Sequence, residues 1–586
     1  RDAAGEPTAL WPAFLDIAAG RVPAAPPEPD SNRFPTGSAW PWLLALAALA
    51  LALGLAMRRR RPPGGRASSA VGGALDAGYQ VGANRLRIWL RRLVGPVEAL
   101  PPALATAIFG LGLAVNAGAA WPLGVMGLVA MAWIAVARPA IVLASLTASL
   151  PFYYALRLHL GPRPVAIVEL LLALLIGARL ARTWLADSAG AAGDPLDPRR
   201  GALPEDGRRA TARRWISDLQ RRLETRLGRL HPLDLAVLLV VAWSALTPLW
   251  ATHPQPARYE WRTVILEPAL LYAVLRAGRD RRQAAQTALD GLVFGAVLAA
   301  AWGLFGSLAT LAPVATPWAS GVLAEGVIRA RGPYGSPNNL ALWLGRALAL
   351  CLGMIAASRG RRRRLGLAAG LIITTGLWAT FSRGAAIFGL PALLLFLALV
   401  LRPRLGRRSL IAGLLGLVAA ALAILPFAAT QRVRGTFDPS PGSTAYYRLR
   451  LWQSAGRMIR DQPWLGVGLD NFLYAYRDFY VQRDVVQERG LSHPHNLVLD
   501  TWTRLGLPGL VLGVWILLGN LQAGRRALAA TADGAWRAMA IGALGMQVYA
   551  LAHGLIDNSV FLVDLASAGW IAQAALLALS EPERRG

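Results

Sequence analysis

Long apolar runs limit the folds that this chain can adopt. Most apolar residues fall in runs of roughly 17–25 residues, the length that a helix needs to cross about 30 Å of hydrocarbon. Only helices and closed barrels satisfy their backbone hydrogen bonds inside a bilayer, and these runs lack the alternation of barrel strands. The sequence therefore predicts an all-α polytopic membrane protein with about 12–15 transmembrane helices and a long outer loop containing short helices.

Composition supports this fold class. Apolar residues make up 55% of the 586 residues and charged residues only 16%, which is unsuited to a set of soluble domains. The predicted spans are 39–57, 102–116, 121–137, 139–156, 164–181, 232–250, 263–278, 284–311, 337–357, 365–381, 384–401, 409–428, 497–520, 536–554 and 559–580. The second and third are short and could form one hairpin.

Arginine clusters give the expected orientation. The chain has a formal net charge of +28 and no lysine, and its arginines gather between spans, as at Arg58–Arg61, Arg361–Arg364 and Arg525–Arg526. Positive residues favour the cytoplasmic side, so we expect these turns inside and the alternate loops outside. Because this bias explains the basic charge, we expect membrane lipids and no nucleic acid as partners.

Two regions are expected. Residues 1–100 would be an outer Pro-rich tail, one transmembrane helix and a basic cytoplasmic linker. Residues 101–586 would be the main membrane domain, with a cytoplasmic insert at 182–231 and a large outer loop at 429–496. The chain starts at Arg1 instead of Met, and a missing upstream segment would explain how the tail reaches the outside.

The predicted outer segments carry four motifs and a short turn. The motifs are Arg329-x-x-Gly332 followed by Ser336-Pro337-Asn338, Arg448-x-x-x-Trp452, Pro463-x-x-Gly466-x-Gly468, and His495-Asn496-x9-Gly506-x-x-Gly509; the turn is Ser382-Arg383-Gly384. Each is weak alone. Their order, their spacing and their shared outer location make the set specific.

This set resembles the O-antigen ligase family, together with O-antigen polymerases and bacterial O-oligosaccharyltransferases. The family pattern from His495 to Gly509 is complete, whereas Ser336 replaces the first Asn of the Asn-Pro-Asn pattern. The resemblance covers roughly residues 140–580. It implies a polyprenyl-diphosphate-linked glycan donor, a lipid or glycan acceptor, and an active site on the periplasmic side of the bacterial inner membrane.

Chemistry suggests roles for the polar residues. Breaking a glycosyl–diphosphate bond requires a base for the acceptor hydroxyl and positive charge for the departing diphosphate. A histidine near the membrane surface can titrate at working pH, so His495 is the expected base and His493 its competitor. Arginine grips phosphate oxygens in a fork, which favours Arg329, Arg383 and Arg448 as the other catalytic residues. Arg383 could instead cap its helix, and His495 could merely anchor the loop.

Further residues are expected to bind substrate or to stay unused. The substrate-binding candidates are Asn338, Asn496, Arg331, Arg450, Trp452 and His493. Close pairs of acids are missing from the outer loops after the first span, so we expect a metal-independent reaction without a cofactor. Glu169 and Glu267 lie toward the outer ends of their spans, and either could pair with a catalytic arginine.

The leading hypothesis is a membrane glycosyltransferase of the O-antigen ligase type. A polymerase that extends lipid-linked repeats shares most of these features, and a protein O-oligosaccharyltransferase is a third alternative. A lipid-linked glycan transporter is the rival from another class, but the chain has no evident inverted repeat. A purely structural membrane protein would leave the gathered arginines and histidine unexplained.

Overall fold

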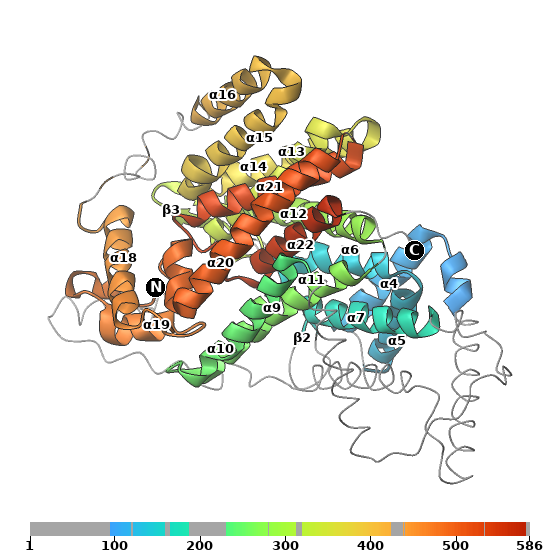
Figure 1. Ribbon diagram of the computed structural model, residues 1–586, viewed down its shortest axis with the longest axis horizontal. Coiled ribbons are helices and arrows are strands. Elements are labelled where there is room, and N and C mark those ends of the chain that lie inside the picture. Colours follow the sequence, from blue (N-terminus) through green and yellow to red (C-terminus); the bar gives the residue numbers. More distant parts are fainter. Residues whose placement is uncertain are drawn as a thin grey trace, which may run out of the picture. The chain divides into compact units, whose positions relative to one another are not determined.

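The computed structural model describes residues 94–118, 121–158, 165–186, 230–278, 280–311, 319–422, 430, 438, 440–532 and 534–581, all within one compact unit (Figure 1). The predictions for the tail, for span 39–57 and for most of the insert at 182–231 lie outside these residues. So does the part of the outer loop at 431–437.

Helices dominate the first half of the described chain. They are α4 (Pro102–Gly118), α5 (Trp121–Ala137), α6 (Pro139–Ser149), α7 (Ile167–Ala186), α9 (Pro232–Ala245), α10 (Pro254–Glu260), the π-helix η3 (Trp261–Leu266), α11 (Glu267–Ala277) and α12 (Arg281–Thr310), with short 3₁₀ turns η1 (Leu150–Phe152) and η2 (Thr247–Leu249). Within the described ranges, the strands form two antiparallel hairpins. These are β1 (Arg157–Leu158) with β2 (Val165–Ala166), and β3 (Val322–Ala324) with β4 (Val327–Arg329).

The second half holds the candidate site. Its helices are α13 (Pro337–Ala357), α14 (Gly360–Ala379), η4 (Ala385–Gly389), α15 (Leu390–Leu405), α16 (Arg407–Leu422), α18 (Thr444–Asp461), α19 (Phe472–Ala475), η6 (Tyr476–Tyr480), η7 (Arg483–Glu488), α20 (Leu497–Ala530), α21 (Gly534–Gly554) and α22 (Val563–Ser580). The outer loop thus contains short helices, as predicted.

Six of the described helical segments are long and apolar enough to cross a membrane, or seven if the bent pair around Arg138 forms one span. The six are Pro232–Leu249, Arg281–Thr310, Pro337–Ala357, Ala385–Leu405, Leu497–Ala530 and Val563–Ser580. The all-α fold class and the multi-pass membrane character are therefore confirmed. The larger number of 12–15 spans stays a prediction.

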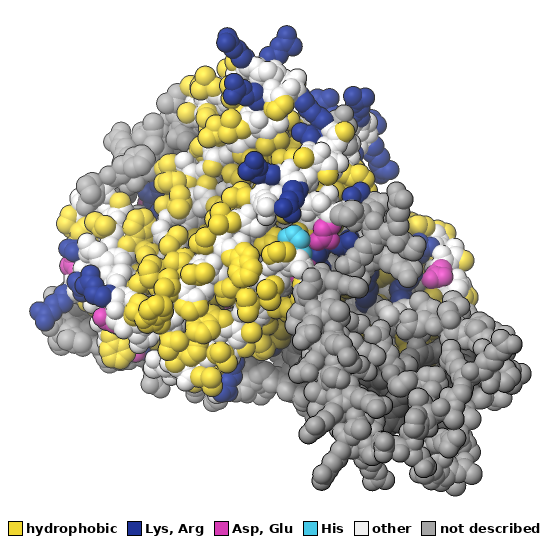
Figure 2. Space-filling model, in the orientation of Figure 1, with side chains coloured by type: hydrophobic (Ala, Val, Ile, Leu, Met, Phe, Trp, Pro, Cys, Tyr) yellow, Lys and Arg dark blue, Asp and Glu magenta, His cyan; other side chains and the backbone are white. Residues whose placement is uncertain are grey.

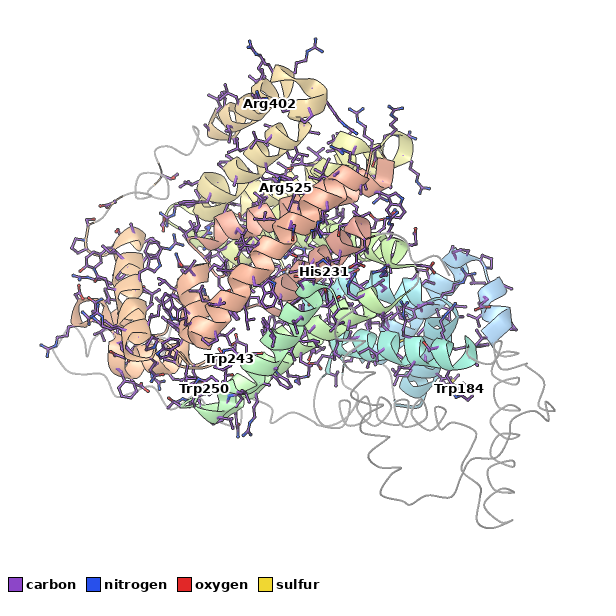
Figure 3. All side chains as sticks on the ribbon, viewed as in Figure 1. Trp184, His231, Trp243, Trp250, Arg402 and Arg525 are labelled. Carbon is purple, nitrogen blue, oxygen red and sulfur yellow. The ribbon has the colours of Figure 1, made fainter. Side chains whose placement is uncertain are left out.

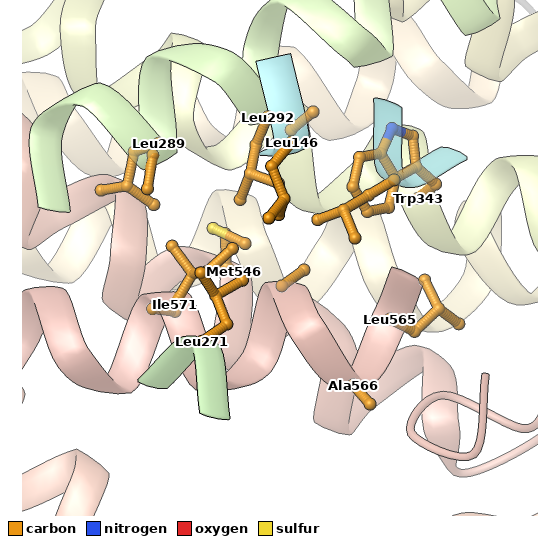
Figure 4. Packing of buried hydrophobic residues seen from close by; sticks show 14 of the residues in the cluster. Leu146, Leu271, Leu289, Leu292, Trp343, Met546, Leu565, Ala566 and Ile571 are labelled. Atoms are coloured by element: carbon orange, nitrogen blue, oxygen red, sulfur yellow. The ribbon is translucent and has the colours of Figure 1, made fainter. Parts of the chain in front are cut away.

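Two helices form the centre of the packing. In both α13 and α22, 83% of the residues in the most apolar stretch of the helix are buried. Helix α13 packs against α21, α14 and α12. Leu292, Met546 and Ile571 meet in this core (Figure 4). At Gly345 the α13 backbone passes so close to the ring of Tyr549 that an added Cβ would lie 1.8 Å from Tyr549 Cζ. Close approach at small residues is the usual basis of helix packing in membranes.

The ends of these helices differ in composition. α13 and α14 pack side by side and are joined by a short turn, so the arginines at Arg359 and Arg361–Arg364 lie at the end opposite the α13 N-terminus. Figure 3 shows His231, the N-cap of α9, at one end of this segment and Trp243 and Trp250 toward the other. Hydrophobic side chains cover much of the face in Figure 2, and arginines gather at its upper edge.

Candidate active site

A cavity of about 260 Å³ opens at the end of the helices away from the arginine-rich turn. The segment before α13, the turn after α14, helix α18 and the loop before α20 all contribute to it. Its lining residues are Arg329, Asn338, Arg383, Gly384, Thr444, Tyr447, Arg448, Leu451, Glu488, Leu491 and His495. All four predicted catalytic residues therefore line one cavity, although they span more than 160 residues of sequence.

The Arg329 motif builds one wall through helix capping. Ser336 is the N-cap of α13, and its hydroxyl accepts a hydrogen bond from the backbone N–H of Asn338 at 3.2 Å. Pro337 follows at the first helical position, where its missing N–H costs nothing. Asn338 then accepts a 2.8 Å hydrogen bond from Arg329, whose Nε also donates to the Thr380 carbonyl at 2.8 Å. Serine is among the favoured N-cap residues, which accounts for Ser336 at the start of α13.

Arg383 is placed by the β3–β4 hairpin and by α18. Its guanidinium donates to Thr444 Oγ1 at 3.0 Å and lies 3.5 Å from Glu325 Oε1 at the hairpin tip. Thr444 opens α18, which presents Tyr447 and Arg448 to the same cavity one turn later. These contacts link the hairpin, the turn after α14 and α18. An arginine at the turn after α14 thus has polar partners as well as a place in the cavity wall.

His495 is held by hydrogen bonds on both sides. Its φ is +50°, a left-handed conformation that non-glycine residues rarely adopt. Before it, Trp452 Nε1 donates to the Pro494 carbonyl at 2.9 Å. After it, the Asn496 side chain caps α20 by accepting from the N–H groups of Val498 and Leu499, both at 3.0 Å.

Asp557 is the functional candidate that the sequence interpretation missed. It lies between α21 and α22, is buried, and its Oδ1 is 2.9 Å from His495 Nδ1. Asn496 Nδ2 donates to the Leu555 carbonyl at 2.9 Å, which ties the histidine loop to the Asp557 segment. The available signal was an acid in the short turn between the last two predicted spans.

His495 and Asp557 have complementary protonation states. Burial and the neighbouring His493 lower the pKa of His495 below 6.5, although its bond to Asp557 acts in the opposite direction. Burial would raise the pKa of Asp557, but the imidazoles of His493 and His495 hold it well below its usual value. The result at neutral pH is a neutral imidazole beside an ionised carboxylate. Such a carboxylate fixes the Nδ1–H tautomer and leaves Nε2 able to accept a proton.

The two glycine motifs join the outer loop to α20. Gly506 (φ +65°) breaks the helical path of α20, and Gly466 (φ +65°) packs directly against this break. A Cβ at Gly466 would lie 2.4 Å from the Thr503 carbonyl oxygen. Backbone groups freed by the break find partners in the turn, since Val467 N–H bonds the Thr503 carbonyl at 2.7 Å and Leu507 N–H bonds the Pro463 carbonyl at 2.9 Å. These glycines therefore scaffold the loop.

The remaining predicted substrate-binding residues lie outside the cavity lining. Asn496 and Trp452 position the loop, as described above. Arg331 donates to the Ser320 carbonyl at 3.0 Å, and Arg450 pairs with Asp484 at 2.8 Å. His493 stands beside His495, with ring centroids 4.2 Å apart, and its Nε2 is 3.8 Å from Asp557 Oδ1.

The predicted pairing of Glu169 or Glu267 with a catalytic arginine is wrong. Both carboxylates bond the same nitrogen of Arg262, at 2.9 Å and 3.0 Å. Arg262 lies in the π-helix directly before Glu267, and helix packing brings Glu169, 93 residues earlier in the chain, to the same guanidinium. The cavity instead contains a different acid, Glu488.

A family model described as O-Antigen ligase matches residues 367–514, about a quarter of the chain. The chain contains an O-antigen ligase family domain. A search of curated proteins gave no match. The matched segment of the O-antigen ligase domain includes Arg383, Arg448 and His495, whereas Arg329 and Asp557 lie outside it.

The match supports a coarse assignment. A domain of this type occurs in membrane enzymes that process lipid-linked glycans, and residues 367–514 resemble such a domain. Among the described residues, His493, His495 and Asp557 also form a group whose ligand atoms lie within 4.8 Å of one another, close enough to hold a metal ion.

Proposed function

We propose that this protein transfers a glycan from a polyprenyl-diphosphate carrier to an acceptor hydroxyl at the periplasmic face of the bacterial inner membrane. The observation that carries the proposal is the cavity in which His495, backed by Asp557, faces three arginines. A base and a cluster of cations at one site are the two requirements for displacing a diphosphate by a hydroxyl.

The reaction begins at the acceptor hydroxyl. Its oxygen attacks the anomeric carbon of the donor glycan while its proton passes to Nε2 of His495. The bond from the anomeric carbon to the phosphate oxygen breaks, and the diphosphate leaves with the electron pair. Asp557 stabilises the imidazolium that forms and keeps the ring oriented. His495 then gives the proton to the departing diphosphate or to water, which returns the ring to its neutral form without a redox step.

The three cavity arginines would neutralise the negative charge of the donor's diphosphate. A diphosphate carries several negative oxygens, and Arg329, Arg383 and Arg448 line the cavity on the same side of the molecule as His495. Arg329 is buried and fixed by two hydrogen bonds, so little reorganisation is needed when the leaving group gains charge. Loss of one such preorganised stabiliser reduces rates by about 10²–10³ in comparable sites.

The arrangement of charge along the helices supports a periplasmic location. The cavity lies at the N-terminal ends of α13 and α20, and the arginine clusters at Arg361–Arg364 and Arg525–Arg526 lie toward their C-terminal ends. Positive clusters favour the cytoplasm, which would put the cavity outside. A lipid-linked donor could approach along α20, several of whose large apolar side chains face outward, Val511 and Leu518 among them.

A ligase and a polymerase would use the same cavity. They differ in the acceptor, which is a lipid core for a ligase and another lipid-linked glycan for a polymerase. The complete His495–Gly509 pattern favours the ligase. A transporter is less well supported, because a base and three arginines at one end of the bundle do not form a midplane binding site.

The test is the fate of lipid-linked glycan in cells that lack the protein. A ligase predicts long polymer that accumulates on its polyprenyl carrier and never reaches an acceptor. Single repeats on the carrier or the acceptor would indicate a polymerase, and lipid-linked glycan retained on the cytoplasmic face would indicate a transporter. Restoring wild-type protein should rescue transfer and restoring His495→Ala should not; rescue by His495→Ala would overturn the assignment of the base.

A further inference from the structure

The histidine cluster behind the cavity has more ligand groups than a single base requires. His495 needs only Asp557 to orient its ring, yet His493 directs Nε2 toward the same carboxylate oxygen. The three ligand atoms lie within 4.8 Å of one another. Two imidazoles and one carboxylate are a ligand set that first-row transition ions prefer and that Mg²⁺ and Ca²⁺ do not.

The spacing fits a small ion. Zinc binds histidine nitrogen and carboxylate oxygen at about 2.0–2.2 Å, so neighbouring ligand atoms in a tetrahedral site are separated by about 3.3–3.5 Å. The Asp557 oxygen lies 2.9 Å from His495 Nδ1 and 3.8 Å from His493 Nε2, on either side of that range. Shifts of a few tenths of an ångström would bring both carboxylate–imidazole separations to this range, and the two imidazole nitrogens lie within 4.8 Å of each other.

The surroundings resemble those of a metal ligand set. His493 Nδ1 is 3.0 Å from Ser492 Oγ, which would hold the ring with Nε2 available as a ligand. Asp557 is almost fully buried, and its Oδ1 also accepts from the Asn558 N–H at 2.9 Å. The two histidine side chains are 22% and 23% exposed, so a hydrated ion could reach them.

We propose that His493, His495 and Asp557 form a site for a divalent transition ion such as Zn²⁺, and that this ion switches off the enzyme. The inference rests on the proposed role of His495 as the base. His495 lines the cavity, whereas His493 and Asp557 do not, so the ion would lie behind the ring and away from the substrate.

The switch follows from the chemistry of imidazole. In the metal-free state Nδ1 carries the ring proton, which Asp557 accepts as a hydrogen bond, and Nε2 has a lone pair for the acceptor proton. An ion that binds Nδ1 uses the lone pair of that nitrogen, so the single proton of the neutral ring moves to Nε2. The ring then donates a hydrogen bond toward the cavity and cannot accept a proton from the acceptor. Transfer stops without any loss of the arginines.

Direct binding tests the site independently of the reaction. Full-length protein in detergent, stripped with EDTA, would be titrated with Zn²⁺ against a chromogenic chelator. We expect one Zn²⁺ per chain and binding at least about tenfold weaker in each of His493→Ala, His495→Ala and Asp557→Asn. The control is His231→Asn, which removes a distant histidine and keeps an N-cap for α9. No uptake by the wild type, or uptake unchanged in the cluster variants, would overturn the site.

Activity tests the switch. Zn²⁺ should reduce transfer by the wild type at the concentration at which it binds, EDTA should restore transfer, and Mg²⁺ should have no effect. Transfer that is indifferent to bound Zn²⁺, or that depends on it, would contradict the switch. Folded, metal-free protein that transfers nothing would contradict the proposed function instead, and the binding measurement would still decide the metal site.

Discussion

At the residue scale, His495 combines backbone strain with a fixed ring. A left-handed conformation at a non-glycine residue costs about 1–2 kcal/mol, so it persists only where its surroundings hold it. The Trp452 and Asn496 side chains provide that hold, one on each side of the histidine. Asp557 then meets Nδ1 at 2.9 Å. Strain at this position is consistent with a side chain whose direction matters more than its backbone preference.

Asp557→Asn should impair the orientation of the His495 ring while leaving the protein folded. The amide removes the negative charge that fixes the tautomer, so the plateau rate should fall by about 10²–10⁴. Asp557 raises the pKa of His495 against the effect of burial, so its loss should lower that pKa further. Wild-type transfer should fall as pH drops through a value below 6.5, because protonated His495 is no base, and the variant should show this fall at still lower pH.

The measurement is a pH–rate profile of glycan transfer, with the thermal midpoint recorded in parallel. Asp478→Asn is the matched control, because Asp478 is an exposed loop carboxylate that pairs with its neighbour Arg477. Asp478→Asn should leave unchanged both the plateau rate of transfer and the pH at which the rate falls on the acid side. An Asp557→Asn variant with the wild-type profile would rule out a positioning role for this carboxylate.

The sequence predicted much of this site but not Asp557. Arg329, Arg383, Arg448 and His495 were recognisable because each belongs to a motif or a short outer turn. Asp557 lies 62 residues after His495 in a turn without a motif, and only the packing of α21 and α22 beside α20 brings it close. Contacts made by helix packing leave no local pattern. The same holds for Glu169 and Glu267, whose partner is Arg262.

At the element scale, the turn at 463–468 and the break in α20 act as one unit. At Gly506 the regular backbone hydrogen bonds of α20 are interrupted. Two hydrogen bonds to the turn replace them, from Val467 N–H to the Thr503 carbonyl and from Leu507 N–H to the Pro463 carbonyl. The periodicity of the sequence predicted a single span beginning at residue 497. It could not predict the break, because a helix break at glycine depends on a partner that fills it.

Gly466→Ala should detach this turn. An alanine there would adopt a left-handed conformation and place its Cβ 2.4 Å from the Thr503 carbonyl oxygen. The two effects together should destabilise the docked turn by about 2–4 kcal/mol. Because the 463–468 turn and His495 flank the same loop, we expect at least about a 100-fold loss of transfer.

Limited proteolysis of the loop, together with the transfer assay, provides the readout. Cleavage between residues 440 and 496 should be faster in Gly466→Ala than in the wild type. Gly490→Ala is the control within the same loop, since a Cβ at Gly490 meets no atom within 4 Å. Equal cleavage and activity in the two variants would show that the docked turn is dispensable.

At the scale of the whole molecule, the chain separates charge between two ends. Arg329 and His495 lie near the N-terminal ends of α13 and α20. The arginines that follow α13, at the start of α14, lie at the other end of the helix bundle, because α13 runs the length of the bundle between the two sites. Arginine was therefore informative in two ways. Clusters between spans indicate the cytoplasmic side, and single arginines in motifs indicate the site. Both patterns are visible in the sequence.

Cysteine labelling should decide the orientation. Cys351 is the sole cysteine and is fully buried in α13, so Cys351→Ala gives a background without thiols. On this background Ser440→Cys lies on an exposed loop four residues before Thr444, which lines the cavity, and Arg361→Cys lies in the exposed basic first turn of α14. A membrane-impermeant maleimide added to intact spheroplasts should label Ser440→Cys and leave Arg361→Cys unlabelled until the membrane is permeabilised. The reverse pattern would put the cavity in the cytoplasm, where the positive-inside bias would have failed and a periplasmic acceptor could not reach His495.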